Sequence, residues 1–313
     1  MIPYLEYIIA DMTNTAGLYS YVSEAGVFCA ALPKKKGGGR VSGWKEVRPM
    51  PPLSKEERRV VLEAGTEPPG SGKYVDFWKE GVYLCRQCGL PLYRSSDKFK
   101  CSCGWPAFDE NLPEAVLRRM DPDGRRTEIV CSNCAGHLGH VFEGERLTPK
   151  NTRHCVNSLS LAFVPTRSAL FAGGCFWGIE DRFASTRGVV TATSGYTGGL
   201  VAAPTYRQVC GGDTGHAEAV RLDFEPSVVS YEALVELFFK MHDPTQLDRQ
   251  GPDFGSQYRT AIFYFDEEQR KIAQKAIDRL KASGVKVVTE LKPAGAFYPA
   301  EDYHQKYLRK QGK

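Results

Sequence analysis

The sequence predicts a protein of two domains, a mainly-β domain followed by an α+β domain, with a boundary near residue 167. The chain of 313 residues is long enough for two separate hydrophobic cores. Between residues 73 and 165, short strand-like runs alternate with turns rich in Gly, Pro and Ser. From PTRS (165–168) onward, strand-like runs alternate instead with amphipathic helical runs.

The composition argues against several functional classes. Hydrophobic residues make up 42% and charged residues 25% of the chain, as in an ordinary globular protein. The net charge of +4 is too small to indicate a nucleic-acid or membrane partner. There is no run of about 18 apolar residues. The N-terminal segment carries Glu6 and Asp11 and lacks a basic start, so we expect no signal peptide and a cytoplasmic location.

Residues 1–44 are expected to be an N-terminal extension. Residues 1–33 are mildly apolar without a clean period, and PKKKGGGR (33–40) is typical of a flexible linker. Cys29 in this extension is either an inert thiol or a resolving cysteine brought in by a flexible arm.

Each domain has its own expected elements. In the first, SKEERRVVLEAG predicts a helix from Ser54 to Gly65. The strand-like runs of the first domain include YVDFW (74–78), GVYLC (81–85), TEIVC (127–131), GHVFEG (139–144) and SLSLAFV (158–164). The strands expected in the second domain are 169–172, 219–226, 258–266 and 285–291, and its helices are 179–185, 230–243 and 266–284.

Four of the ten cysteines have the spacing of metal ligands. Cys85-x-x-Cys88 and Cys131-x-x-Cys134 are two pairs that together provide a tetrahedral site with bonds of about 2.3 Å. Four soft ligands leave no open position, so a structural zinc ion is predicted, with iron as the alternative metal. Unrelated buried cysteines are the other interpretation, and a thioredoxin-like motif lacks the βαβ context that it requires.

Cys155 is a candidate nucleophile in the strand-like run RHCVNSLSLAF. Arg153 and Asn157 fall on the same strand face, and a cationic neighbour favours a thiolate. The upstream motif HLGHVF supplies His137 and His140, which are candidates for proton donation and for positioning substrate or water. A buried, unreactive cysteine is the alternative.

Four motifs of the first domain carry a family resemblance: AGTEPPGSGKY, KFKCSCGWPAF, CSNCAGHLGHVF and RHCVNS. Over residues 45–166 the chain resembles methionine sulfoxide reductase B. The resemblance implies two antiparallel β-sheets and a nucleophile at Cys155. The supporting set that it implies is His137, His140, Arg153 and Asn157, with Trp105 and Phe142 as an apolar pocket for the methyl group of the substrate.

Two positions depart from this family's pattern. Cys103 falls where many members carry the resolving cysteine, whereas Cys101 is an extra thiol and the alternative resolver. A position that is often Asp in the family is Gly144 here, between Glu143 and Glu145.

Cys175 is the second candidate nucleophile. GGCFWG places it at or just before the N-terminus of a helix, where free N–H groups and the helix dipole stabilise a thiolate. Phe176 and Trp177 offer aromatic surface suited to an S-methyl group, with ordinary core packing as the alternative.

The second half closely resembles methionine sulfoxide reductase A over residues 168–313, through GCFWG, GYTGG, PTYRQVCGGDTGHAEAV, HDPTQLDRQGPDFGSQYRTAIF and PAGAFYPAEDYHQKYL. The resemblance implies an α/β plait of the ferredoxin-like type, with Glu218 as proton donor to the sulfoxide oxygen. The side chains that it implies as hydrogen-bond partners of that oxygen or its water are Tyr206, Tyr258 and Asp253. By itself, Glu218 would be predicted as an exposed strand carboxylate.

The resolving partner of Cys175 stays open. Many family members carry resolving cysteines near the C-terminus, but YHQKYLRKQGK has none. Cys210, an external thiol and a cysteine from elsewhere in the chain are the three candidates.

Together the resemblances imply a bifunctional reductase of methionine sulfoxide, free or in proteins, with the R epimer reduced by the first domain and the S epimer by the second. A thiolate attacks the sulfoxide sulfur, and the resulting sulfenic acid condenses with a second thiol to a disulfide. Thioredoxin or a similar dithiol then reduces that disulfide. The alternatives are a redox-responsive zinc-binding module without turnover and an enzyme with one active head.

Overall fold

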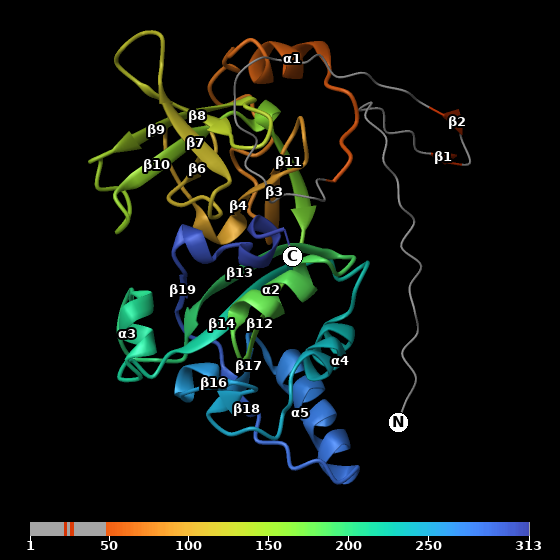
Figure 1. The fold of residues 1–313 in the computed structure, drawn as a ribbon. Coiled ribbons are helices and arrows are strands. Elements are labelled where there is room, and N and C mark those ends of the chain that lie inside the picture. The colour runs from red at the N-terminus through yellow and green to blue at the C-terminus, as the bar shows by residue number, and fades with distance from the viewer. Residues whose placement is uncertain (1–21, 24–25, 28–47, 313) are drawn as a thin grey trace. The chain divides into compact units, whose positions relative to one another are not determined.

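The computed structural model describes residues 22–23, 26–27 and 48–312 (Figure 1). The chain divides into two compact units, Met1–Arg40 and Val41–Lys313. In the first unit, the described residues form one antiparallel pair, β1 (Val22–Ser23) and β2 (Gly26–Val27). The predicted linker and Cys29 lie outside the described residues.

Helix α1 (Lys55–Val61) starts where the sequence predicts but ends earlier. The hydroxyl of Ser54 accepts a hydrogen bond from the N–H of Glu57, whose carboxylate accepts one from the N–H of Ser54, which is a capping box. The predicted end at Gly65 is wrong, because the N–H of Gly65 donates to the carbonyl of Arg59 and closes the loop after the helix. Ala64, rather than Gly65, has a positive φ of 53°.

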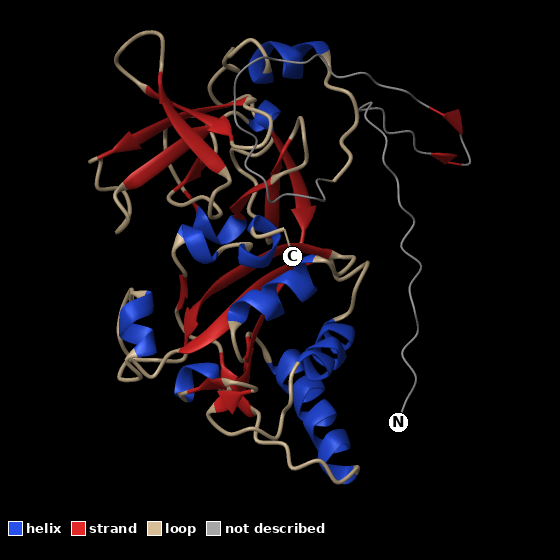
Figure 2. Ribbon diagram, in the orientation of Figure 1, coloured by secondary structure: helices blue, strands red, loops and turns tan. Residues whose placement is uncertain are grey.

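Residues 81–165 form two antiparallel sheets, as Figure 2 shows in red. The three-stranded sheet has the order β11-β3-β4, with bounds β3 (Gly81–Cys85), β4 (Pro91–Arg94) and β11 (Leu161–Pro165). The six-stranded sheet has the order β5-β6-β10-β9-β8-β7, with bounds β5 (Lys98–Phe99), β6 (Ala107–Phe108), β7 (Val116–Met120), β8 (Thr127–Cys131), β9 (His137–Glu143) and β10 (Thr152–Val156). Buried Tyr83, Phe108 and Ile129 belong to their common core. The mainly-β character predicted for the first domain is therefore confirmed.

Two predicted strands of this region differ. Residues 74–76 lie in a turn and residues 77–78 in an irregular segment, from which Phe77 packs onto Phe163 with ring centroids 4.7 Å apart. The aromatic residues of this run therefore marked core contacts rather than a strand. Residues 158–160 form a 3-10 turn, and the strand begins only at Leu161.

The sheet of the second domain has six strands in the order β18-β17-β12-β14-β13-β19, antiparallel except for the pair β17–β18. Its strands are β12 (Arg167–Gly173), β13 (Val189–Thr197), β14 (Ala217–Phe224), β17 (Thr260–Tyr264), β18 (Glu290–Pro293) and β19 (Phe297–Pro299). The helices that contact it are α2 (Phe176–Ala184), α4 (Tyr231–Met241) and α5 (Glu267–Ala282). Phe183 of α2 and Phe238 of α4 pack on Phe171 of β12, as the predicted amphipathic faces require.

Two boundaries in this domain differ from the prediction by more than two residues. Helix α2 begins at Phe176 rather than at 179, so Cys175 is its N-cap residue. The strand predicted at 285–291 begins only at Glu290, because the N–H of Val288 donates to the carbonyl of Pro244 instead of joining the sheet. The remaining short elements are α3 (Tyr206–Cys210), β15 (Arg249–Gln250), β16 (Asp253–Phe254) and α6 (Tyr307–Lys310).

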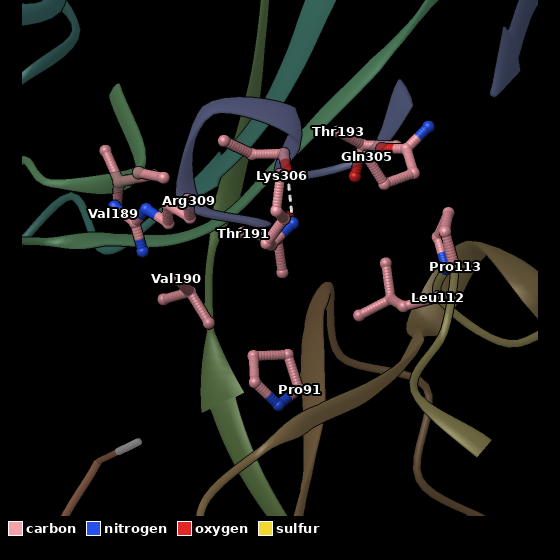
Figure 3. A pocket seen from close by; sticks show the side chains of 12 residues that line it. Pro91, Leu112, Pro113, Val189, Val190, Thr191, Thr193, Gln305, Lys306 and Arg309 are labelled. Carbon is pink, nitrogen blue, oxygen red and sulfur yellow. Dashed lines mark hydrogen bonds between the residues drawn. The ribbon is translucent and has the colours of Figure 1, made fainter. Parts of the chain in front are cut away.

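Within the unit Val41–Lys313, residues of the β-rich first domain also contact residues in the sheet of the second domain. Arg94 Nε lies 2.8 Å from a carboxylate oxygen of buried Asp223, which is far away in sequence. A cavity of about 80 Å³ lies between Pro91 and Leu112 of the β-rich part and residues such as Thr193 of the second part (Figure 3). Among the described residues, no helix is long and apolar enough to cross a membrane.

Candidate functional sites

The first site is built across three neighbouring strands. Cys155 on β10 lies opposite His140 on β9, which lies opposite Glu128 on β8. Directly opposed residues of antiparallel strands point to the same sheet face, so these three side chains form one row. Gly139, which precedes His140 on β9, has a φ of +155°, and a Cβ there would lie 2.0 Å from the carbonyl oxygen of Cys155. Only glycine lets β9 approach the candidate nucleophile this closely.

The two thiols predicted as nucleophile and resolver are in contact. The Sγ atoms of Cys155 and Cys103 lie 3.9 Å apart, with Cys155 as the donor. This hydrogen bond lowers the pKa of Cys103 to about 5 and raises the pKa of Cys155 above its usual range. The contact therefore favours a thiolate on Cys103 over one on Cys155. Positively charged Arg153 lowers the pKa of both thiols.

His137 belongs to a hydrogen-bonded chain that runs from the buried residues His137 and Glu128 to exposed Arg119. Its Nδ1 lies 2.6 Å from Glu128, and Glu128 forms a two-pronged ion pair with Arg119. Burial alone would raise the pKa of Glu128, but Arg119 and His137 hold it below its usual value. Burial lowers the pKa of His137, although Glu128 acts in the opposite direction. Nε2 of His137 is buried and has no hydrogen-bond partner within the described part of the chain.

The second predicted histidine has a carboxylate of its own. His140 Nε2 lies 2.5 Å from Asp121, and its ring centroid is 5.6 Å from that of His137. The hydrogen bond with His140 lowers the pKa of Asp121. The two histidines are thus held side by side by two different acidic residues.

Arg153 is held by Glu145, the residue that follows Gly144. Its guanidinium makes two hydrogen bonds to Glu145, at 2.7 and 2.8 Å. It also lies over the ring of Phe142, 4.3 Å from the centroid, which is cation–π geometry. Glu145 and Phe142 therefore fix the position of the Arg153 guanidinium.

Asn157 and Trp105 both form hydrogen bonds with the backbone of Glu67. Asn157 is not on the strand with Cys155 and Arg153, because β10 ends at Val156. Its side chain accepts from the N–H of Glu67 and donates to the carbonyl of Leu138. The indole N–H of Trp105 donates to the carbonyl of Glu67, 3.2 Å away. The buried carboxylate of Glu67 in turn accepts from the N–H groups of residues 158 and 159.

The four predicted metal ligands converge. The sulfurs of Cys85, Cys88, Cys131 and Cys134 lie within 4.8 Å of one another, and two of the sulfur pairs are 3.6 Å apart. A tetrahedron with metal–sulfur bonds of about 2.3 Å has edges of about 3.8 Å, so the observed cluster fits a metal ion. None of the four is in a disulfide.

The second site lies at the N-terminus of α2. Cys175 is the N-cap residue, and it lines a surface hollow with Gln250, Asp253 and Met241. Burial, with a further contribution from negatively charged Glu218, raises the pKa of Cys175 to about 12. The N–H groups of the first turn lower the pKa, as predicted for a helix N-terminus, but they do not outweigh burial.

Glu218 is a buried carboxyl group rather than an exposed one. It projects from β14 with 2% of its surface exposed, and it accepts a hydrogen bond from the N–H of Phe176, 3.1 Å away. Burial, followed by negatively charged Asp253, raises the pKa of Glu218 to about 7. A carboxyl group with this pKa can hold a proton at neutral pH and release it.

The predicted tyrosines lie within electrostatic reach of this carboxyl group. Burial, followed by Glu218, raises the pKa of Tyr258 to about 12. A hydrogen bond with Cys210 raises the pKa of Tyr206, and Glu218 adds to this effect. The fold therefore brings Glu218, Asp253 and both tyrosines together from β14, β16, a 3-10 turn and α3.

His304 and Tyr307 pack against Trp177, one of the two aromatic residues predicted to form an apolar surface. The indole N–H of Trp177 donates to Nδ1 of His304, 3.0 Å away, and Tyr307 stacks on Trp177 with ring centroids 3.7 Å apart. The ring of Tyr206 lies 4.4 Å from that of His304. Phe176 is fully buried in the core, so among the predicted pair Trp177 is the more accessible ring.

Sequence reasoning missed the residues that hold the predicted ones in place. These are Glu67, Asp121, Glu128, Glu145 and His304. Glu128 alone carried a usable signal, because it is a charged residue inside the predicted strand 127–131. Glu67, Asp121 and Glu145 lie in irregular segments and His304 in a 3-10 turn, where side-chain directions are not periodic.

Comparisons with known proteins agree with this division of the chain. The family model described as "Peptide methionine sulfoxide reductase" matches residues 167–313, and that described as "SelR domain" matches residues 53–165. The peptide methionine sulfoxide reductase MsrA of Pasteurella multocida is 54% identical over 144 residues, which are 46% of this chain and 83% of that protein. The MsrA of Methanosarcina mazei is 54% identical over 147 residues, covering 46% and 70% of the two chains.

The chain is also similar to proteins of known structure. The crystal structure of reduced Mxr1 from Saccharomyces cerevisiae is 34% identical with a TM-score of 0.46, and the match covers 47% of this chain and 87% of that one.

Proposed function

Because the chain belongs to the peptide methionine sulfoxide reductase family, with a SelR domain preceding the A-type domain, we propose that its two cysteine sites reduce opposite epimers. The R epimer of methionine sulfoxide reacts at Cys155 and the S epimer at Cys175. The observation that carries this proposal is that each cysteine has a separate set of proton-holding groups. Cys155 has the histidine–carboxylate pairs of its sheet, and Cys175 has buried Glu218.

In the first domain the proposed step begins at the thiol pair. Cys103 takes the proton of Cys155, whose sulfur attacks the sulfoxide sulfur. His137 or His140 protonates the sulfoxide oxygen, which passes as hydroxyl from the methionine sulfur to the sulfur of Cys155, so that methionine leaves and Cys155 becomes a sulfenic acid. Cys103 then attacks that sulfur, forms a disulfide and releases water. Their separation of 3.9 Å supports Cys103 rather than Cys101 as the resolving cysteine.

In the second domain Glu218 supplies the proton. In the substrate-free protein Cys175 is a thiol and Glu218 has a pKa of about 7, so moving one proton between them gives the thiolate and the acid that the reaction needs. Tyr206, Tyr258 and Asp253 hydrogen-bond the sulfoxide oxygen or its water. Trp177, held by His304, lies against the S-methyl group. The thiol that resolves Cys175 is Cys210, another cysteine of the chain or an external thiol.

The four-cysteine cluster completes the proposal as a structural zinc site. A bound zinc ion would clamp the turns that follow β3 and β8, and with four protein ligands it would leave no position for substrate. Its contribution would be to folding rather than to the reaction.

We further propose the domain limits, fold type, reductant and location. The B-type domain spans residues 45–166, and the A-type domain spans 168–313. Strand order β17-β12-β14-β13 around α2 and α4 supports a ferredoxin-like plait for the second. The reductant is thioredoxin or a similar dithiol. All nine cysteines of the described residues are free, which suits a reducing compartment such as the cytoplasm.

The test is a single-turnover assay on resolved R and S sulfoxides. Cys155→Ser is expected to lose only R reduction and Cys175→Ser only S reduction, with Cys210→Ser as a matched control in which the first turnover with each epimer persists. A redox sensor without turnover predicts no methionine from the parent protein. An enzyme with one active head predicts no reduction of one epimer, and activity of both variants on both epimers would refute the proposal.

A further inference from the structure

Three thiols, rather than two, meet at the first site. Cys103 contacts Cys155, with their Sγ atoms 3.9 Å apart, and Cys101 lies only two residues before Cys103, within electrostatic reach of its sulfur. Arg153 lies within electrostatic reach of all three sulfurs. A cycle with one nucleophile and one resolving thiol leaves Cys101 without a role.

Cys101 and Cys103 are placed so that a disulfide can form between them. Ser102 and Cys103 lie in a turn, where Cα atoms two residues apart are about 5–6 Å from each other. A disulfide requires a Cα separation of about 4.4–6.8 Å. A bridge across a single residue closes a small ring, and strained disulfides are more easily reduced than relaxed ones.

We propose that Cys101 is a second resolving cysteine, which takes over the oxidised state from Cys155. This inference rests on the proposed function, because it begins from the Cys155–Cys103 disulfide. The thiolate of Cys101 attacks the sulfur of Cys103, so the Cys103–Cys155 bond breaks and a Cys101–Cys103 bond forms. Cys155 leaves as a thiolate beside Arg153, and the proton of Cys101 passes to solvent. The external dithiol then reduces Cys101–Cys103.

The exchange changes the number of methionines that each chain can form without an external reductant. It returns Cys155 to the thiol state while two oxidising equivalents stay on Cys101 and Cys103. Without any external reductant, Cys155 can then attack a second sulfoxide and stop as a sulfenic acid. The domain therefore yields about two methionines per chain, whereas a cycle that ends at Cys155–Cys103 yields about one.

The experiment counts methionine formed from excess R sulfoxide by the pre-reduced full-length chain after removal of the reductant. All proteins carry Cys175→Ser so that only the first site reacts. We expect about two methionines per chain for this parent and about one for the additional Cys101→Ser change. Peptide mass mapping of the parent should then show the peptide with Cys101 and Cys103 lighter by two hydrogens, and Cys155 as a sulfenic acid.

Two controls separate the other routes. Cys210→Ser removes an exposed thiol of the second domain, and Cys29→Ser removes the thiol of the N-terminal extension. Both should still yield about two methionines, and a fall to about one in either would assign the exchange to that cysteine and overturn the proposal. Equal counts with and without Cys101 would also overturn it. A parent that forms no methionine would instead refute the proposed function.

Discussion

The carboxylate of Glu128 lies 2.6 Å from Nδ1 of His137, and both side chains are almost completely buried. A carboxylate only accepts hydrogen bonds, so the proton of this contact sits on Nδ1. The other ring nitrogen, Nε2, is therefore the one left to exchange a proton with a ligand. Glu128 fixes the tautomer and the orientation of a ring that the sequence identified without its partner.

Glu128→Gln should lower the turnover number for the R epimer by about tenfold or more, because the amide does not hold the imidazole in one protonated form. The pKa of His137 should fall further, so the alkaline limb of the rate profile should move to lower pH. Steady-state rates against pH measure both. Glu143→Gln, at an exposed residue paired with Arg118, is the matched control. An unchanged pH profile would show that Glu128 is only structural.

Glu218→Gln should lower reduction of the S epimer by about 10²- to 10⁴-fold, because the amide cannot give a proton to the departing oxygen. Reduction of the R epimer by the same protein should be unchanged, which serves as the internal control for folding. Single-turnover rates on each resolved epimer provide the measurement. A similar loss on both epimers would point to a general defect in the protein.

The raised pKa of Glu218 predicts a pH-dependent stability of the second domain. The folded state holds this proton up to a pKa of about 7 and the unfolded state only to the ordinary value of 4.5, so stability is lost as pH rises between them. The loss should be about 3 kcal/mol at most. Urea unfolding at pH 5 and pH 8 should show a smaller difference in Glu218→Gln than in the parent. An equal difference would place the proton elsewhere.

The lowered pKa of Cys103 predicts a thiolate that persists in mild acid. Because its pKa is about 5, Cys103 should stay ionised at mildly acidic pH, where ordinary thiols are protonated. Alkylation followed by peptide mass mapping should label Cys103 at pH 6. Cys155→Ala removes the hydrogen-bond donor and should slow that labelling, whereas Cys210→Ala should leave it unchanged. Equal labelling of Cys103 with and without Cys155 would contradict the shared-proton pair.

Metal removal should affect the two domains differently. A chelator that extracts an ion from Cys85, Cys88, Cys131 and Cys134 should abolish R reduction and leave S reduction intact. The released metal, measured with a colorimetric indicator and by elemental analysis, identifies zinc or iron. Cys88→Ser should have the same selective effect as the chelator. Equal loss of both activities would contradict a site confined to the first domain.

Several boundaries could not be predicted because they depend on distant partners. The run 285–291 has strand-forming residues, but Val288 bonds to Pro244 and the strand starts only at Glu290. Residues 74–78 are rich in aromatic residues, as strands often are, yet Phe77 reaches the core from an irregular segment. In both cases local propensity was overridden by tertiary contacts.

The sequence by itself predicted which side chains would carry the chemistry, because motif spacing and strand or helix periodicity are local properties. It located Cys155 on a strand, Cys175 at a helix N-terminus and the four clustered cysteines. Only the tertiary structure decided the pKa values of these side chains and their neighbours. Burial of Glu218, the approach of Cys103 to Cys155 and the pairing of His137 with Glu128 each depend on segments far apart in the chain. A pKa is set by distance and burial in space, which spacing along the chain does not specify.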